Sequence, residues 1–246
     1  MRLQVLAAGF LAAFGAVLAA QEHPHWGYGG KAGPDHWADL EADYGQCRLG
    51  HEQSPIDIRS ARKADLAPIS FAYADGPAEI ANNGHSVQVT PSAGGAITVG
   101  GVEYALIQFH FHAPSEEKIE GKAHAMVAHF VHKSADDTLA VVAVLLDAGR
   151  ENGAWRPIFD NLPGQADETR LIPGGVDPGR LLPEARGYYA FMGSLTTPPC
   201  SEGVRWFVMK HPVSISQAQL ASFRKLYPHN ARPTQPINGR AIEESR

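Results

Sequence analysis

Short apolar segments separated by turn residues run through this 246-residue chain and limit the folds that it can adopt. From about residue 86 the segments are rich in Val, Ile, Phe and Tyr, and Gly, Pro, Asn or Asp recur between them. This spacing is typical of β-strands joined by turns. The candidate strands are residues 86–90, 96–99, 104–112, 125–133, 139–146, 188–192 and 204–210.

Helical patterning is weak, and only residues 216–226 are predicted to form a regular helix. Ser216 can cap its N-terminus, and the apolar residues that follow have helical spacing. The segment up to about Pro55 is expected to be irregular. No repeat, low-complexity tract or linker divides the chain, so we expect one mainly β domain.

The N-terminus has the pattern of a secretory signal peptide. One cation, Arg2, precedes an apolar run that ends in small residues, which predicts a signal peptide over residues 1–20 with cleavage after Ala19 or Ala20. An uncleaved anchor is the alternative, because the run is nearly long enough to span a bilayer. The small residues at its end, with no basic residue directly after it, favour cleavage. The mature domain, residues 21–246, is therefore expected to be periplasmic or secreted, without stable membrane association.

The charge balance excludes one class of partner. A net charge of -5, a pI of about 6.2 and the lack of a Lys/Arg cluster predict no nucleic-acid partner. A small, diffusible substrate fits better, and the sequence leaves a homodimer open.

The chain has two cysteines, Cys47 and Cys200. An even number of cysteines in an exported protein is most simply interpreted as a disulfide. Two unpaired, buried thiols are the alternative, which export disfavours.

Two histidines lie inside an apolar strand, in the stretch LIQFHFH that ends at His112. A buried imidazole needs a compensating partner. Alternate residues of a strand share a face, so His110 and His112 point the same way with Cα atoms about 6.6 Å apart. Both rings can then reach one metal ion, at Zn–N distances of about 2.0–2.1 Å.

A third ligand is expected from the next strand, which offers His124, His129 and His132. Parity places His129 on one face and the other two on the opposite face. We choose His129 because it is central in the strand, whereas His124 adjoins a turn, and we expect His132 to be a core residue. Three imidazoles without a nearby thiolate or carboxylate ligand favour Zn²⁺ with an open, catalytic fourth position.

An open site of three imidazoles is the arrangement of carbonic anhydrases, and the chain resembles an alpha-class carbonic anhydrase of the exported bacterial type. Matching segments, among them QFHFH and GSLTTPPC, occur in family order over nearly the whole mature chain. They are residues 25–28, 53–58, 82–85, 108–112, 128–132, 193–200 and 235–237. The resemblance implies a large, twisted, mostly antiparallel central sheet with short peripheral helices, and the hydration of carbon dioxide to bicarbonate by zinc-bound hydroxide.

The resemblance also implies roles for individual residues. It makes His110, His112 and His129 the zinc ligands. Thr196 matches the threonine that accepts a hydrogen bond from the hydroxide and donates to a carboxylate, here Glu116. His85 matches the proton shuttle, for which an unperturbed pKa near 6.5 is suitable.

Further matches concern the surroundings of the metal. Gln108 matches the partner that fixes one imidazole, Cys47 and Cys200 match a family disulfide, and the Ser54–Pro55 and Pro198–Pro199 bonds match cis bonds. The residues that match the binding site for carbon dioxide are Val131, Val141, Leu195, Thr197, Val204 and Trp206.

One residue departs from the family pattern. Val127 stands where the family usually has a glutamate that orients the third ligand, His129. Glu117 is not expected to substitute, because it follows the Pro114 turn next to Glu116. Loss of such a partner typically costs 10–100-fold in metal affinity or activity, so we expect weaker zinc retention, reduced turnover, or both.

Three other functions remain as alternatives. A cupin-type metal oxygenase fits the spacing of His110, His112 and Glu116, with Glu116 as a ligand to iron or manganese, but a second cupin motif is lacking. A catalytically weak or silent zinc-binding domain is favoured only by Val127. An esterase with Thr196 as nucleophile lacks a His/Asp relay in the sequence.

Overall fold

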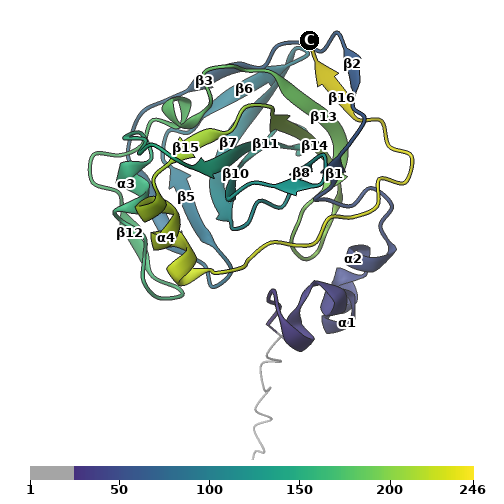
Figure 1. Ribbon diagram of the computed structural model, residues 1–246, viewed down its shortest axis with the longest axis horizontal. Helices are drawn as coiled ribbons and strands as arrows, with labels where there is room; N and C mark the ends of the chain where they lie inside the picture. The colour runs from purple at the N-terminus through teal and green to yellow at the C-terminus, as the bar shows by residue number, and fades with distance from the viewer. Residues whose placement is uncertain (1–24) are drawn as a thin grey trace, which may run out of the picture.

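The computed structural model describes residues 25–246, and its centre is a large twisted sheet of 13 strands (Figure 1). Along the sheet the strands follow the order β12-β4-β5-β7-β10-β11-β14-β13-β16-β2, while β15 pairs with β11, and β6 pairs with both β3 and β7. Most pairs are antiparallel. The parallel pairs of this sheet are β11 with β14, β11 with β15, and β16 with β2. The predicted mainly β domain is therefore confirmed.

The strands of the large sheet are β2 Arg62–Ala64, β3 Ser70–Tyr73, β4 Ala78–Asn82, β5 Val87–Pro91, β6 Gly95–Val99, β7 Val102–His112, β10 Met126–Lys133, β11 Leu139–Ala148, β12 Thr169–Leu171, β13 Tyr188–Ser194, β14 Glu202–Met209, β15 Val213–Ile215 and β16 Glu243–Ser245. A second, three-stranded sheet consists of β1 Asp57–Ile58, β8 Lys118–Ile119 and β9 Lys122–Ala123.

The helices are short and lie at the periphery (Figure 1). The α-helices are α1 Trp37–Leu40, α2 Gln46–Leu49, α3 Arg156–Phe159 and α4 Gln217–Leu226. The 3-10 helices are η1 Gly30–Ala32, η2 Pro34–His36, η3 Ala42–Tyr44 and η4 Pro178–Leu181. Among residues 25–246, no helix has the length and hydrophobicity needed to cross a membrane. The predicted signal peptide, residues 1–20, lies outside the described residues.

Each strand that the sequence predicts is present, with ends shifted by a few residues. The predicted helix is α4, which begins with a reciprocal capping interaction: Gln219 N donates to Ser216 Oγ over 3.1 Å, and Ser216 N donates to Gln219 Oε1 over 2.8 Å. The expectation of an irregular N-terminal segment is wrong, because five short helices fill the stretch between Gly30 and Leu49.

Two apolar clusters cover the two faces of the central strands. Strands β10 and β11 are buried almost throughout, as expected for strands covered on both faces. The larger cluster includes Ala128 and Phe130 of β10, and the smaller cluster includes Val127 and Val131 of the same strand. His129 lies between Val127 and Val131 in this alternation, so its side chain projects to the face of the smaller cluster. This face carries the candidate site.

Candidate metal centre

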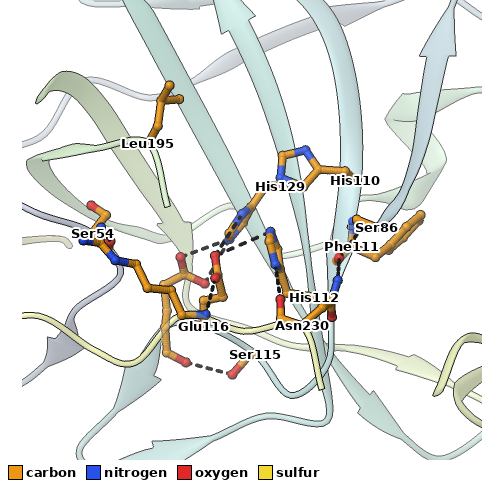
Figure 2. Close-up of polar contacts among 12 residues, drawn as sticks. Ser54, Ser86, His110, Phe111, His112, Ser115, Glu116, His129, Leu195 and Asn230 are labelled. Atoms are coloured by element: carbon orange, nitrogen blue, oxygen red, sulfur yellow. Dashed lines mark hydrogen bonds and ion pairs between the residues drawn. The ribbon is translucent and has the colours of Figure 1, made fainter. Parts of the chain in front are cut away.

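Three imidazoles converge on the face of β7 and β10 that carries the smaller apolar cluster (Figure 2). The strands are antiparallel, and their register sets His129 opposite His110. Potential ligand atoms of His110, His112 and His129 all lie within 4.8 Å of one another. The strand-parity argument therefore predicted the cluster correctly.

The other two candidate ligands lie elsewhere. His132 Nε2 is 2.7 Å from the Tyr73 hydroxyl, and its ring stacks against Tyr73, a neighbour of the larger apolar cluster. This confirms that His132 is a core residue. The third histidine of the stretch, His124, pairs with Asp147 over 2.9 Å.

Hydrogen bonds leave one free nitrogen on each of the first two rings. Gln108 Oε1 accepts from His110 Nδ1 over 2.9 Å, and the backbone oxygen of Asn230 accepts from His112 Nδ1 over 2.7 Å. Both rings are thus held in the tautomer that presents Nε2 as a lone-pair donor. His112 Nε2 is fully buried and has no hydrogen-bond partner among the described residues, so its lone pair is suited to bind a metal ion.

The third ring is hydrogen-bonded through its other nitrogen, Nε2, and its partner is a carboxylate. His129 Nε2 lies 3.0 and 3.1 Å from the two carboxylate oxygens of Glu117, so Nδ1 is the nitrogen left for a metal. The expectation that His129 lacks such a partner is wrong. Val127 cannot supply it, but the side chain of Glu117 does. The Val127 substitution therefore gives no reason to expect weak zinc retention.

Burial sets the protonation of the ligand rings. It lowers the pKa of His110 to about 3 and, with the neighbouring histidines, lowers the pKa of His112 well below its ordinary value. Burial also disfavours the charged form of His129, but the charges and hydrogen bond of the carboxylates, Glu117 foremost, outweigh it and raise the pKa of His129. Neutral imidazoles are the form that binds a metal.

A second buried carboxylate, Glu116, faces the same rings. Its Oε2 lies 3.5 Å from His112 Nε2 and 3.8 Å from His129 Nδ1 (Figure 2). Arg232 N donates to Oε1 over 2.7 Å. The interactions of the carboxyl group with Arg232 N and with the Thr196 side chain both favour its ionised form and act to lower its pKa. Burial raises the pKa of Glu116 to about 7, although the charge of His129 opposes the rise.

The donor set fits Zn²⁺. Three imidazole nitrogens, two Nε2 and one Nδ1, lie close together at a site that no cysteine of the described chain adjoins. Such a set is typical of catalytic zinc with an open fourth position.

An apolar wall adjoins the ligands. Val131, Val141, Val204 and Trp206 belong to the smaller cluster, and the partly buried Leu195 packs against it. The Trp206 ring meets His129 edge to face at 5.0 Å, and its Nε1 donates to the backbone oxygen of Ser194 over 3.1 Å. The residues predicted to receive the substrate are thus gathered beside the three histidines. Thr197 follows in the same loop and accepts from Cys200 N through its backbone oxygen.

The predicted proton shuttle, His85, lies in an aromatic stack with Trp26 and His25. Trp26 covers it at a centroid distance of 3.5 Å with nearly parallel planes, and His25 lies at 4.6 Å. Burial and the charge of His25 lower the pKa of His85 to about 4. No feature of the sequence revealed this stack.

The predicted disulfide is present, between Cys47 of α2 and Cys200. Cys200 closes the loop of Thr196 and Thr197 between β13 and β14. The predicted cis bonds at Ser54–Pro55 and Pro198–Pro199 are also present, and a further one at Ala113–Pro114 was not foreseen.

Sequence reasoning missed three contacts with the site, made by Glu117, Asn230 and Arg232. Asn230 and Arg232 reach the site from a segment more than 100 residues after the ligand strand β7, and no local pattern marks them. The adjacent pair Glu116 and Glu117 was visible in the sequence. Which of these two carboxylates faces Thr196 and which faces His129 depends on the turn that precedes them.

Comparisons with known proteins agree with this geometry. Residues 32–246 match the model of the family "Eukaryotic-type carbonic anhydrase". A carbonic anhydrase of Klebsiella pneumoniae is 45% identical over 223 residues, which are 89% of this chain and 91% of the relative. One of Pectobacterium carotovorum is 43% identical, over 91% of this chain and 92% of the relative.

Solved structures give the same result for the fold. The alpha-carbonic anhydrase of Thermovibrio ammonificans, in complex with the inhibitor sulfanilamide, superposes with a TM-score of 0.87. It is 45% identical and covers 90% of this chain and 99% of its own. A dioscorin complexed with ascorbate superposes with a TM-score of 0.83 at 32% identity, over 89% of this chain and 97% of its own.

Proposed function

The chain belongs to the eukaryotic-type, or alpha-class, carbonic anhydrase family, and from this we propose that it catalyses the zinc-dependent, reversible hydration of carbon dioxide to bicarbonate and a proton. The observation that carries the proposal is the convergence of three imidazoles, with His112 and His129 buried and His110 partly buried. In each ring the nitrogen that points away from the other two rings is engaged in a hydrogen bond. A Zn²⁺ ion held by His110, His112 and His129 would act as a Lewis acid that makes hydroxide available from water near neutral pH.

Thr196 and Glu116 would orient the nucleophile. An ionised carboxylate can only accept, so Glu116 requires the Thr196 hydroxyl to donate to it. The Thr196 oxygen is then left as an acceptor, and an oxygen nucleophile that donates to it turns a lone pair toward the substrate. Arg232 N holds the carboxylate in place from the other side over 2.7 Å.

The apolar wall suits a small, nonpolar substrate. Val131, Val141 and Trp206 present no group that must be hydrated, and Leu195 and Val204 extend the same surface. Carbon dioxide can rest against such a wall without loss of hydrogen bonds. Thr197 offers a polar contact for bicarbonate at the edge of the wall.

The proton must leave through a second group. His85 is proposed to carry it to solvent, because an imidazole can gain and lose a proton near neutral pH. The stack on Trp26 is a resting position for this ring, and its lowered pKa, about 4, makes it a weak acceptor there. Rotation away from Trp26 would raise its basicity as the ring is rehydrated.

We also propose that the protein acts outside the cytoplasm. The Cys47–Cys200 disulfide supports this location, because such bonds persist in oxidising compartments. The predicted signal peptide supports it from the sequence.

A silent zinc-binding domain is the second candidate, and the departure at Val127 favoured it. Glu117 removes much of that support, since His129 has its carboxylate. The cupin alternative is wrong, because the chain has the carbonic anhydrase fold and belongs to that family.

The test is to measure zinc content and the rate of CO₂ hydration by stopped flow, on the purified mature chain and after dialysis against a chelator. We expect about one zinc per chain and fast hydration that is lost on chelation and restored by Zn²⁺. His112→Ala should abolish both, whereas His124→Ala, which removes a histidine of the same region paired with Asp147, should change neither. Zinc without hydration would instead identify a silent domain.

A further inference from the structure

The partner of each ligand ring comes from a different place in the chain. Gln108 stands two residues before His110 on β7 and reaches its ring from the same face of the same strand. The corresponding position for His129 on β10 is Val127, which is fully buried and has no polar atom in its side chain. The strand that carries His129 therefore cannot fix its own ligand ring.

Glu117 reaches the ring from outside that strand. Its side chain is fully buried, and both carboxylate oxygens lie within 3.1 Å of His129 Nε2. A buried carboxylate without a partner would be costly, and in the described chain His129 is the hydrogen-bond partner that meets this requirement.

The backbone around Glu117 is fixed independently of its side chain. Ser115 Oγ donates to the backbone oxygen of Glu117 over 2.7 Å, and the next residue, Lys118, begins β8 and pairs in parallel with Asp57. The Glu117 carboxylate is therefore carried by a turn whose backbone position is fixed by these contacts.

We propose that Glu117 is the positioning residue for the third metal ligand and replaces, from the β8 side, the carboxylate that position 127 does not provide. The proposal rests on the proposed zinc function. Because a carboxylate only accepts, Glu117 keeps the proton of His129 on Nε2 and directs Nδ1 toward the ion. Glu116, its neighbour, serves Thr196, so one dipeptide supports both the metal and the nucleophile.

The test compares zinc release from four zinc-loaded proteins: the wild type, Glu117→Gln, the double variant Glu117→Gln/Val127→Glu, and Glu103→Gln. A chromogenic chelator measures the rate. Glu117→Gln should release zinc about 10–100-fold faster, because an amide can present a donor or an acceptor to Nε2. Glu103 is exposed on β7, so its substitution controls for the loss of one charge and should change nothing.

The double variant distinguishes a role of Glu117 in positioning His129 from a general contribution of Glu117 to the stability of the fold. A glutamate at position 127 would lie two residues before His129 on the same face, as Gln108 does for His110, and should restore slow release. The His129 Nε2–H signal in the proton NMR spectrum of the zinc-loaded protein should be lost in Glu117→Gln and recovered in the double variant. A residue that only stabilised the fold would not be replaced by a carboxylate on another strand.

The outcomes separate this proposal from the proposed function. If the wild type binds zinc and hydrates carbon dioxide but Glu117→Gln releases zinc at the wild-type rate, Glu117 is not the positioning residue. If the wild type holds no zinc, the proposed function fails first. If Glu117→Gln does not fold, the double variant provides the test. A double variant that folds and releases zinc slowly supports the proposal. A double variant that does not fold, or that folds but releases zinc quickly, contradicts it.

Discussion

The hydrogen-bonding capacity of single side chains decides how this site can work. His110 and His112 each donate to a neutral oxygen, from an amide and a backbone carbonyl, whereas His129 donates to a carboxylate. A negatively charged acceptor increases the basicity of the ring and its strength as a ligand. The third ligand is therefore the one whose metal bond depends most on its partner.

Glu116→Gln tests the orienting role of the neighbouring carboxylate. The amide can donate as well as accept, so it no longer forces the Thr196 hydroxyl to donate to it. We expect kcat/KM for CO₂ hydration to fall by about 10–100-fold with zinc content unchanged. Stopped-flow rates and metal analysis of the same preparations measure both. Loss of zinc in parallel with activity would mean that Glu116 binds the metal.

The sequence predicted the cluster of three histidines because its geometry is local. Alternation along a strand puts His110 and His112 on one face, and parity on the next strand leaves His129. The role of Glu117 could not be obtained in this way. It depends on how the turn between β7 and β8 is held, by Ser115 Oγ on the backbone oxygen of Glu117 and by the pairing of Lys118 with Asp57, which no periodicity describes.

The N-terminal segment determines the surroundings of the His85 ring through aromatic contacts. Its helices form a small cluster around Trp37 and the disulfide, against which Trp26 packs, and Trp26 in turn covers the His85 ring. A segment without strands thus controls the environment of the proposed proton carrier.

Trp26→Ala should raise the pKa of His85 from about 4 toward its unperturbed value of about 6.5, because burial is the main cause of the shift. An NMR titration of the His85 ring in the zinc-loaded chain measures this change. The neutral ring is favoured in the folded wild type, so its contribution to stability is present above pH 6.5 and is lost as the pH falls towards 4. In Trp26→Ala, the contribution of His85 to the free energy of unfolding should therefore change less as the pH falls from 6.5 to 4. A pKa that stays near 4 would show that His25, and not the tryptophan, sets it.

The apolar clusters on the two faces of the central strands have different neighbours. The larger cluster packs these strands against α3 and α4, and the smaller cluster contains the proposed substrate wall, with Trp206 in contact with His129. The individual strands followed from sequence patterns, but their order did not. The parallel pairing of β11 with β14 and of β16 with β2 joins segments 60 or more residues apart, and only the global packing of the sheet determines it.

Two long-range connections hold the N-terminal segment against the segments that carry Thr196 and Arg232. Arg232 Nη2 donates to the backbone oxygen of Cys47 over 2.9 Å, and the Cys47–Cys200 bond joins α2 to the loop of Thr196. The two half-cystines are 153 residues apart in the sequence. Cross-linking so long a loop restricts the unfolded chain, for which a chain-entropy model gives about 5 kcal/mol.

Replacement of both cysteines by serine should therefore lower the free energy of unfolding by about 2–5 kcal/mol, measured by urea denaturation of the metal-free proteins. Activity of the zinc-loaded variant should fall as well, because Cys200 lies four residues after Thr196 and fixes the end of its loop. A reductant should reproduce both effects in the wild type and leave the variant unchanged. An unaltered free energy of unfolding would contradict the role in stability. Lower stability with full activity would mean that the hydrogen bonds from Leu195 N to Ser201 O and from Trp206 Nε1 to Ser194 O hold Thr196 without the bridge.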